Sequence, residues 1–386
     1  MSFMTAKQFS KWPPVAMFVL VTLTLNLPVR AQEAGADAAT TITFSQQTTP
    51  NNGPNNFLMG IAGDAENDIW AVGTTVPGPI GLHFNGTMWK SVPMALPTRA
   101  NINAVSVLKP NDVWAVGYTF SGASMTSVIQ HFNGTKWAVV PSPHFAGGDE
   151  LFAVKAIASN DVFAVGEIGG NSEKASPLVE HFDGTTWSVI PGPAVKAGQT
   201  LSLHSIAATS HKDLWVTGSG GPVFFSVVSH FDGQKFTNVP FPLSGASLGG
   251  IAAIAPNDAW VVGGQAATAT TQSTLTAHWN GQRWTVVPSP NATASDTLGS
   301  VSAISSNDVW AVGCGNFCGL DTGAGSLLVE HWDGTQWTIN PTPAIGNGEV
   351  ASDIVALPSG DVFVAGTVSG NGIFAGTLVL HGKEGK

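Results

Sequence analysis

Charged residues are scarce in this sequence, and the shortage excludes several classes of partner. Only 10% of the 386 residues are charged, and 25 acidic residues outnumber 15 basic ones, which gives a formal net charge of −10. Binding to nucleic acid or to an anionic membrane surface depends on clustered Lys and Arg that displace counterions. Because the sequence has no such cluster, neither nucleic acid nor a charged membrane surface is expected as a partner.

Cysteine is equally rare, with only Cys314 and Cys318, separated by three residues. A redox motif has two intervening residues, so this spacing excludes that chemistry. A cysteine metal site would need two further ligands, and no second Cys or His cluster lies nearby in the sequence. In an exported protein the pair favours a short-loop disulfide. We predict that disulfide, with no metal and no cofactor.

Long hydrophobic runs are also absent, and the main apolar stretch lies near the first residue. Lys7 and Lys11 precede the apolar segment 15–27, which is followed by a small-residue cleavage site at Ala31. This arrangement is typical of a secretory signal peptide over 1–31, since a spanning helix needs about 20 residues. We therefore expect export to the periplasm or the exterior, without membrane insertion after cleavage. An uncleaved membrane anchor is the alternative.

A seven-residue motif, NDVWAVG at 111–117, occurs in seven versions along the chain. Successive copies are 44 to 53 residues apart, a period that is typical of solenoids and propellers. The Asp of the motif falls at Asp68, Asp112, Asp161, Asp213, Asp258, Asp308 and Asp361. The period predicts one repeated unit in a single domain.

A second signature follows each motif, namely a histidine, an aromatic residue and Asn-Gly or Asp-Gly, as in HFNGTKW at 131–137. Asn-Gly between apolar segments is a strong signal for a β-hairpin with a type I′ turn, in which both central residues have positive φ. The repeat histidines are His83, His131, His181, His230, His278, His331 and, in a truncated copy, His381. Each repeat is therefore predicted to contain a tight hairpin.

The abundance of turn residues, with 45 Gly and 24 Pro, indicates short strands joined by turns. In the second repeat, strands are expected at 105–108, 113–118, 127–132 and 136–140. The second strand is apolar on both faces, as expected for a strand between neighbouring sheets. Four antiparallel strands repeated seven times predict an all-β, seven-bladed β-propeller.

The last repeat stops after its His-containing strand and lacks a fourth strand. Residues 43–51 align with 283–291, the fourth strand of the fifth repeat and the residues that follow it. We therefore predict that the N-terminal strand completes the last blade, which removes a free sheet edge. Residues 41–386 would then form one propeller domain, preceded by a flexible lead over 32–40.

The paired signatures resemble exported bacterial β-propellers with NDVWAVG-type repeats, and more distantly Kelch, WD-repeat and two-component-regulator propellers. The resemblance implies the fold and says little about activity, since propellers support binding, scaffolding and several enzyme chemistries. The Trp- and Asp-rich hairpins also resemble the Asp-box of sialidase-type propellers, enzymes that need three arginines and a Tyr nucleophile. After residue 31 the chain has only Arg99, Arg283 and the single tyrosine Tyr118, so this class is excluded.

The repeat Asp and His residues are interpreted as framework, because seven copies in seven blades cannot serve one active site on the ring axis. Asp at a turn bonds backbone N–H groups, and by similarity to WD repeats we predict a His–Asp hydrogen bond in each blade. Five hairpin tryptophans are interpreted as core between blades, unless exposure marks a lectin with one glycan site per blade. These are Trp89, Trp137, Trp187, Trp284 and Trp337.

Connections of variable length indicate where a ligand would bind. The spacing from repeat Gly to repeat His varies from 10 to 18 residues, and binding residues usually lie on variable loops of a rigid scaffold. We therefore expect the site on the face that carries the second-to-third and fourth-to-first strand connections, called the loop face below. The candidate binding residues are Tyr118, Phe120, His144, Asp149, Glu150, Glu167, Phe317 and Asp321.

The sequence as a whole predicts an exported, monomeric, non-catalytic binding propeller whose loop face recognises a protein or a glycan. One alternative is the lectin with repeated sites between blades. Another is a polysaccharide hydrolase or lyase that uses a carboxylate pair on the loop face. Two carboxylates outside the repeat positions, about 5–10 Å apart in a deep pocket, would favour the enzyme.

Overall fold

The computed structural model describes most of residues 42–384. The gaps lie at 77, 123, 170–174, 269, 316–324, 347 and 371–372. Contacts divide the chain into two units, 1–39 and 40–386, and every described residue belongs to the second unit. Within the described residues, no helix is long and apolar enough to cross a membrane.

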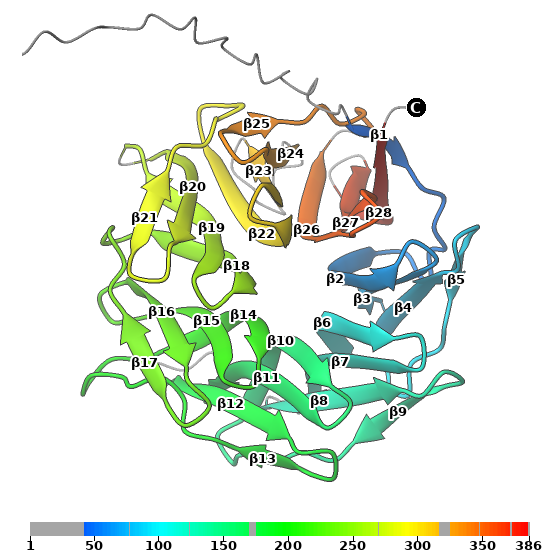
Figure 1. The fold of residues 1–386 in the computed structure, drawn as a ribbon. Coiled ribbons are helices and arrows are strands. Elements are labelled where there is room, and N and C mark those ends of the chain that lie inside the picture. The colour runs from blue at the N-terminus through cyan, green and yellow to red at the C-terminus, as the bar shows by residue number, and fades with distance from the viewer. Residues whose placement is uncertain are drawn as a thin grey trace, which may run out of the picture. The chain divides into compact units, whose positions relative to one another are not determined.

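The described residues form seven antiparallel sheets of four strands each, arranged as blades of a ring (Figure 1). Blade 1 has β2 (Asn56–Ala65), β3 (Asp68–Thr75), β4 (Pro79–Phe84) and β5 (Trp89–Ser91). Blade 2 has β6 (Ala100–Lys109), β7 (Asp112–Ser121), β8 (Ser124–Phe132) and β9 (Trp137–Val140). Blade 3 has β10 (Asp149–Ala158), β11 (Asp161–Ile168), β12 (Ser176–Phe182) and β13 (Trp187–Val189).

The remaining four blades follow the same order, except for the last. Blade 4 has β14 (Ser202–Ser210), β15 (Asp213–Gly220), β16 (Phe225–Phe231) and β17 (Phe236–Val239). Blade 5 has β18 (Ser247–Ala255), β19 (Asp258–Ala266), β20 (Gln272–Trp279) and β21 (Trp284–Val287). Blade 6 has β22 (Asp296–Ser305), β23 (Asp308–Gly315), β24 (Ser326–Trp332) and β25 (Trp337–Ile339). Blade 7 has β26 (Glu349–Ala356), β27 (Val362–Gly370), β28 (Ile373–Glu384) and β1 (Ile42–Gln46).

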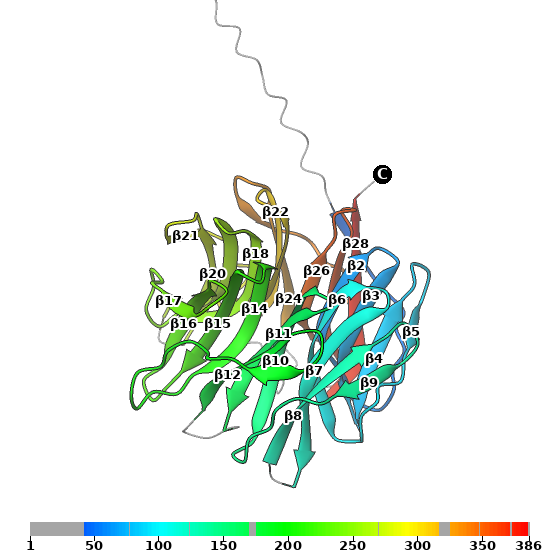
Figure 2. The ribbon, with the colours of Figure 1, turned by 60° about the horizontal axis from the view of Figure 1, so that its bottom comes forward.

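The first strand of each blade borders the centre of the ring (Figure 1, tilted in Figure 2). Each of these strands contains a β-bulge, at which its register with the second strand shifts. In blade 2 the register changes directly after the pair Ile102–Gly117, which makes Asn103 the extra residue. Gly117, the last residue of the repeat motif, is required at this point, since a Cβ there would lie 2.0 Å from the carbonyl oxygen of Asn101. The bulge removes Asn103 from the ladder, and its side chain lines the central channel instead.

The bulge also explains why the predicted first strand was too short. The sequence predicted a strand at 105–108, whereas β6 runs over Ala100–Lys109. Alternation between buried and exposed positions breaks at the bulged residue, so the residues before it do not continue the pattern that follows it. The other three strands of this blade lie where they were expected, within a few residues.

The predicted hairpins are present, but their turn type was wrong. In blade 2, four residues connect β8 to β9, and the N–H of Asn133 donates to the carbonyl oxygen of Lys136. Gly134 has a φ of +89°, whereas Asn133 is not among the residues with positive φ. The Asn133 side chain instead accepts hydrogen bonds from the N–H groups of Thr135 and Lys136. The Asn therefore acts through its side chain rather than through a left-handed backbone.

Strand β1 completes blade 7, as the sequence predicted. It pairs antiparallel with β28 over the whole of Ile42–Gln46. The alignment holds beyond the strand, because the N–H of Thr377 donates to Asn51 Oδ1 at 3.0 Å while that of Thr274 donates to Asn291 Oδ1 at 2.9 Å. The N-terminal segment therefore repeats both the strand and the loop anchor of an ordinary blade.

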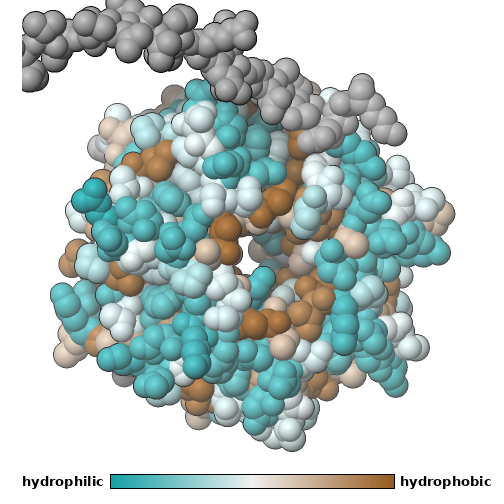
Figure 3. Space-filling view, viewed as in Figure 1, coloured by the Kyte–Doolittle hydropathy of each residue, from teal (hydrophilic) through white to brown (hydrophobic). Residues whose placement is uncertain are grey.

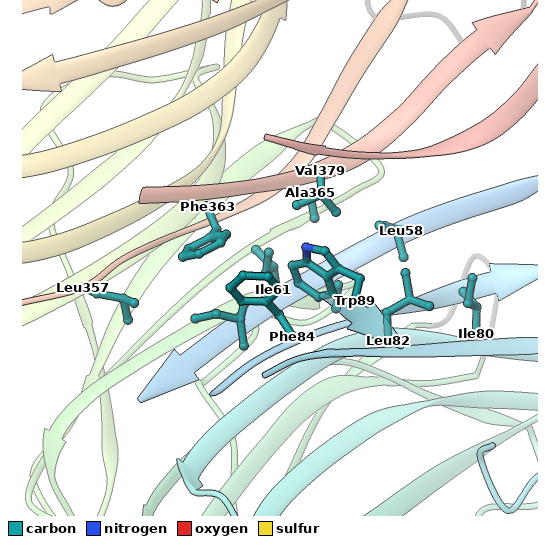
Figure 4. Packing of buried hydrophobic residues seen from close by; sticks show 12 residues of the cluster. Leu58, Ile61, Ile80, Leu82, Phe84, Trp89, Leu357, Phe363, Ala365 and Val379 are labelled. Carbon is teal, nitrogen blue, oxygen red and sulfur yellow. The ribbon is translucent and has the colours of Figure 1, made fainter. Parts of the chain in front are cut away.

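The hydrophobic core lies between neighbouring blades rather than in the channel. At the junction of blades 7 and 1, Phe363 and Val379 face Leu58, Phe84 and Trp89 across the interface (Figure 4). A strand between two neighbouring sheets is buried on both faces, which is why the second strands are apolar throughout. Since each interface has its own cluster, the ring forms one continuous scaffold.

Candidate functional site

The repeat His and Asp residues form the predicted hydrogen bond in all seven blades. The Nε2–Oδ1 distances range from 2.5 Å in the pair His381–Asp361 to 2.9 Å in the pair His131–Asp112. Each imidazole also packs on the aromatic residue of the preceding motif, as His331 does on Trp310 with ring centroids 4.2 Å apart. These pairs are distributed over the blades and converge on no common point.

The hairpin tryptophans are buried, with 3–5% of each residue exposed. Their rings pack between blades, as Trp137 does against Trp70 with ring centroids 5.2 Å apart. A sugar cannot stack on a ring that neighbouring blades already cover. The lectin alternative required exposed rings at these positions, so the structure contradicts it.

A central channel of about 420 Å³ runs between the first strands of all seven blades. Figure 3 shows one face of the ring, where hydrophobic and hydrophilic residues border the opening. The bulged residues line the channel on its loop-face side, since each stands near the start of its first strand. They are Met59, Asn103, Phe152, His204, Gly249, Gly299 and Ser352. Large side chains therefore occupy the arc from blade 1 to blade 4, and small ones the arc from blade 5 to blade 7.

Four polar groups gather beside the larger arc and are called the mouth cluster below. Glu150 and Glu167 are direct partners across β10 and β11, which places their side chains on the same face of blade 3. Tyr118 lies near the end of β7 and His204 near the start of β14. The ends of second strands and the starts of first strands meet at the loop face, so the cluster lies on the face that the sequence predicted.

Electrostatic coupling shows that these four groups share one environment. Burial raises the pKa of Glu150 to about 7, and the neighbouring Glu167 carboxylate raises it further, against a hydrogen bond from Asn103. Burial and the Glu150 carboxylate likewise raise the pKa of Tyr118. Desolvation by the surrounding inner strands lowers the pKa of His204, although Glu167 opposes that shift and the side chain remains exposed. The cluster thus holds a carboxyl group that titrates near neutral pH.

Hydrogen bonds and ring contacts fix the orientation of these side chains. The Asn101 amide donates to the Tyr118 hydroxyl at 2.6 Å, and the exposed Phe120 ring lies 5.2 Å from the Tyr118 ring. His204 Nε2 lies 2.9 Å from Ser219 Oγ, and its ring centroid is 5.7 Å from that of Phe152. The mouth therefore combines fixed aromatic surfaces with two carboxyl groups.

Two predicted site residues, Asp149 and His144, anchor a loop instead. Asp149 is 1% exposed and accepts hydrogen bonds from the N–H groups of Ser127 and Phe145. His144 Nδ1 lies 3.3 Å from the same carboxylate. In blade 7, Glu349 accepts hydrogen bonds in the same way from the N–H groups of Ile345 and Gly346. The acidic residue at the start of the first strand is therefore a repeat position that fixes the connection between blades.

Three further predicted positions depend on residues outside the described ranges. Phe317 and Asp321 both fall in the gap at 316–324, and so does Cys318. Cys314 is 4% exposed at the end of β23. The predicted disulfide and the predicted contribution of Phe317 and Asp321 to the site therefore stay predictions.

The sequence reasoning missed the bulged residues, above all Asn103, Phe152 and His204. Each stands fourteen residues before the last Gly of its repeat motif, and that constant spacing is the signal by which an alignment of the repeats could find them. The sequence reasoning also missed the pairing of Glu150 with Glu167, because no sequence motif contains both residues. Only the antiparallel register of blade 3 makes them neighbours.

Comparison with known proteins supports the fold and leaves the activity open. No known family model and no curated protein matches the sequence. Solved structures that match include YCF48 bound to a D1 peptide, with TM-score 0.56, 14% identity, and coverage of 90% of this chain and 99% of that one. YCF48 from Cyanidioschyzon merolae matches with TM-score 0.55 and 15% identity over 88% and 98% of the two chains.

A third match is a PL25 ulvan lyase bound to a glucuronate–sulfated rhamnose oligosaccharide, with TM-score 0.57 and 9% identity. It covers 84% of this chain and 93% of the lyase. At such low identity these similarities establish the class of protein, a seven-bladed β-propeller, and establish no function.

Proposed function

We propose that this chain is an exported propeller that binds a segment of another protein at the loop-face mouth of its channel. The resemblance to exported propellers with NDVWAVG repeats and the signal-peptide pattern over 1–31 support export. The observation that carries the binding proposal is the carboxylate pair Glu150–Glu167 beside Tyr118 and the exposed Phe120.

The chemistry of the mouth fits a segment that carries Lys or Arg. Two carboxyl groups attract a cation, and the rings of Tyr118 and Phe120 offer both apolar contact and cation–π attraction. Gly249 and Gly299 have no side chains on the opposite arc of the channel, so an extended segment has room to enter there. The net charge of −10 favours a basic partner as well.

One structural neighbour supports a peptide ligand in particular. YCF48 has a structure in which it is bound to a D1 peptide, and it covers nearly the same length of propeller. At 14% identity the two proteins share the fold, so the similarity supports the kind of ligand and not its sequence.

The proposal predicts that affinity for basic peptides rises with pH. Glu150 has a pKa of about 7, so it is mostly neutral at pH 6 and mostly ionised at pH 8, where a cationic side chain gains an attraction of a few kcal/mol at most. We expect peptides selected from a random library to be rich in Lys and Arg, and to bind roughly tenfold more tightly at pH 8 than at pH 6. Fluorescence anisotropy measures both affinities.

Variants at the mouth provide the controls. Glu150→Gln should remove the pH dependence and weaken binding at pH 8, whereas Glu66→Gln, the same charge change in the exposed turn between β2 and β3, should do neither. Selected peptides without basic residues, or an equal effect of both variants, would refute the proposal. A glycan array run in parallel would show whether the ligand is a saccharide instead.

A polysaccharide-cleaving enzyme is a second candidate, favoured by the Glu150 pKa of about 7 beside Tyr118, and by His204 beside the partner carboxylate Glu167. A group that titrates near neutral pH can exchange a proton with a substrate, and a PL25 ulvan lyase shares the fold. Activity on a panel of uronate-containing polysaccharides that disappears in Glu150→Gln would support it. Equal product formation by the native chain and the variant would exclude this site.

A further inference from the structure

The interface between blades 3 and 4 contains an imidazole that the other interfaces lack. Two residues before each repeat Asp, the other six blades have Ser, Pro or Glu, whereas blade 4 has His211. His211 Nδ1 lies 2.9 Å from Asp161 Oδ1 of blade 3, and His181 Nε2 lies 2.8 Å from the same oxygen. Two imidazoles from neighbouring blades therefore share one carboxylate oxygen.

A change in the aromatic core provides room for this second imidazole. Five blades have tryptophan as the aromatic residue of the repeat motif, but blade 3 has the smaller Phe163. Its ring centroid lies 4.4 Å from that of His181 and 5.4 Å from that of His211. The two imidazole rings meet edge to face, 5.2 Å apart. His211 is thus packed on the aromatic core and not free in solvent.

The three ligand atoms are arranged as a metal site requires. Within the described residues, this is the one group of three potential ligands whose donor atoms all lie within 4.8 Å of one another. Metal–ligand bonds of about 2.0–2.2 Å place tetrahedral ligand atoms roughly 3.4 Å apart, so side-chain shifts on the order of 1 Å bring the three donor atoms, which now lie within 4.8 Å of one another, to that separation.

Exposure differs between the three side chains in a way that leaves the site accessible. The side chains of Asp161 and His181 are 17% and 18% exposed, while that of His211 is 43% exposed. A metal ion can reach the site from solvent, and three protein ligands leave one coordination position for water.

We propose that Asp161, His181 and His211 bind a single Zn²⁺ ion across the blade 3–blade 4 interface. Two imidazoles and a carboxylate suit Zn²⁺ and similar transition-metal ions, whereas Ca²⁺ and Mg²⁺ prefer all-oxygen sites. The bound ion replaces the protons by which both imidazoles now contact the carboxylate, and it links two blades that are otherwise joined by packing and by the His211–Asp161 hydrogen bond.

Isothermal titration of the untagged, chelator-treated protein with ZnCl₂ tests this proposal. We expect one high-affinity equivalent per chain, undisturbed by excess Ca²⁺ or Mg²⁺. His211→Ser installs the residue that Ser159 and Ser306 provide at other interfaces, where they donate to the repeat Asp, so the fold should persist. This variant should bind Zn²⁺ at least about 100-fold more weakly, since loss of a direct ligand costs more than loss of a supporting group.

The matched control is His144→Ser, which removes a histidine that contacts Asp149 in a different place. It should leave the Zn²⁺ affinity unchanged. Zn²⁺ should also raise the melting temperature of the native chain and of the control, but not that of His211→Ser. Equal affinities for the native chain and His211→Ser, or no tight equivalent at all, would overturn the proposal.

Discussion

At the scale of residues, every repeat Asp contacts the repeat histidine of its own blade, but its other hydrogen-bond partners differ from blade to blade. Asp112 accepts from His131 of its own blade, from the Trp114 indole at 3.0 Å, and from Ser159 of the following blade at 2.5 Å. The matching oxygen of Asp68 has no hydrogen-bond partner, since Pro110 stands where a serine would donate. The residue at this position therefore decides whether Asp68 and Asp112 are hydrogen-bonded to the following blade.

Removal of the Asp112 carboxylate should destabilise the protein. Asp112→Ala leaves three donors without an acceptor at a position that is 4% exposed, and each buried unpaired donor costs about 1–3 kcal/mol. We expect the free energy of unfolding to fall by about 3 kcal/mol, with a lower midpoint in denaturant titration.

Asp112→Asn is the control for that experiment, because its amide oxygen still accepts from Trp114 and His131. It should lose less stability than the alanine variant. If both variants unfold at the midpoint of the native chain, the network contributes nothing to stability.

Two buried glutamates, Glu180 and Glu330, lack the partner that their counterpart in blade 2 has. Gln130 Oε1 accepts a hydrogen bond from the N–H of Ala95 at 2.8 Å. Prolines replace that alanine in the linkers before blades 3 and 6 and have no N–H to donate. Both glutamates are 0% exposed, and among the described residues no donor lies within hydrogen-bond distance of any of their carboxylate oxygens. Burial raises the pKa of each to about 8, helped by Asp149 and Asp296 respectively and opposed by the hydroxyls of Ser142 and Ser289.

These glutamates should make the protein less stable as the pH rises. Each stays protonated in the folded chain up to about pH 8 but ionises near pH 4.5 when unfolded, so the folded state binds more protons between these values. The stabilisation of the folded state that is fully present below pH 4.5 is lost progressively as the pH rises to 8. The loss is on the order of 4 kcal/mol per glutamate.

The double variant Glu180→Gln and Glu330→Gln removes this linkage. Its free energy of unfolding should equal that of the native chain near pH 4.5 and exceed it by several kcal/mol at pH 8, measured by urea titration at both values. A difference that does not change with pH would show that the glutamates are ionised in the folded state.

At the scale of elements, the closing strand β1 bears a function that no other outer strand has. It holds the first and last parts of the chain together, and its Phe44 is 5% exposed, with its ring centroid 6.1 Å from that of Trp310. Its hydrogen bonds also cover the edge of β28, which would otherwise be open to pairing with another chain.

Truncation of the Phe44 side chain should therefore loosen the closure. We expect Phe44→Ala to lower the free energy of unfolding by about 3–5 kcal/mol and to accelerate amide hydrogen exchange in β28. Gln46→Ala, at an exposed position of the same strand, should change stability by less than about 0.5 kcal/mol. Unaltered exchange in β28 of Phe44→Ala would mean that blade 7 closes without this contact.

At the scale of the whole molecule, the repeat motif is regular from blade to blade, whereas the residues that line the central channel are not. The repeat motif recurs in every blade, yet the residue at the bulge changes from His204 or Phe152 on one arc to Gly249 or Gly299 on the other. The Asp161 site depends likewise on two exchanges at one interface, the appearance of His211 and the replacement of tryptophan by Phe163. Features that distinguish this propeller from a generic one therefore sit at positions where the repeat is broken.

The sequence by itself determined the blade number, the hairpins, the His–Asp pairs and the closing strand. Each of these follows from a local pattern that repeats seven times, so an error in one copy is corrected by the others. The loop face was predicted instead from the unequal lengths of the loops, with Tyr118, Glu150 and Glu167 on it, and its role in binding stays a prediction.

Only the tertiary structure decided which of those residues act together. Glu150 meets Glu167 through strand register, the bulges turn His204 into the channel, and packing of blade 4 on blade 3 brings His211 to Asp161. Such contacts join residues that are distant in sequence and occur once each, so no periodicity reports them. The repeated residues specify the scaffold, and packing between non-identical blades specifies the site.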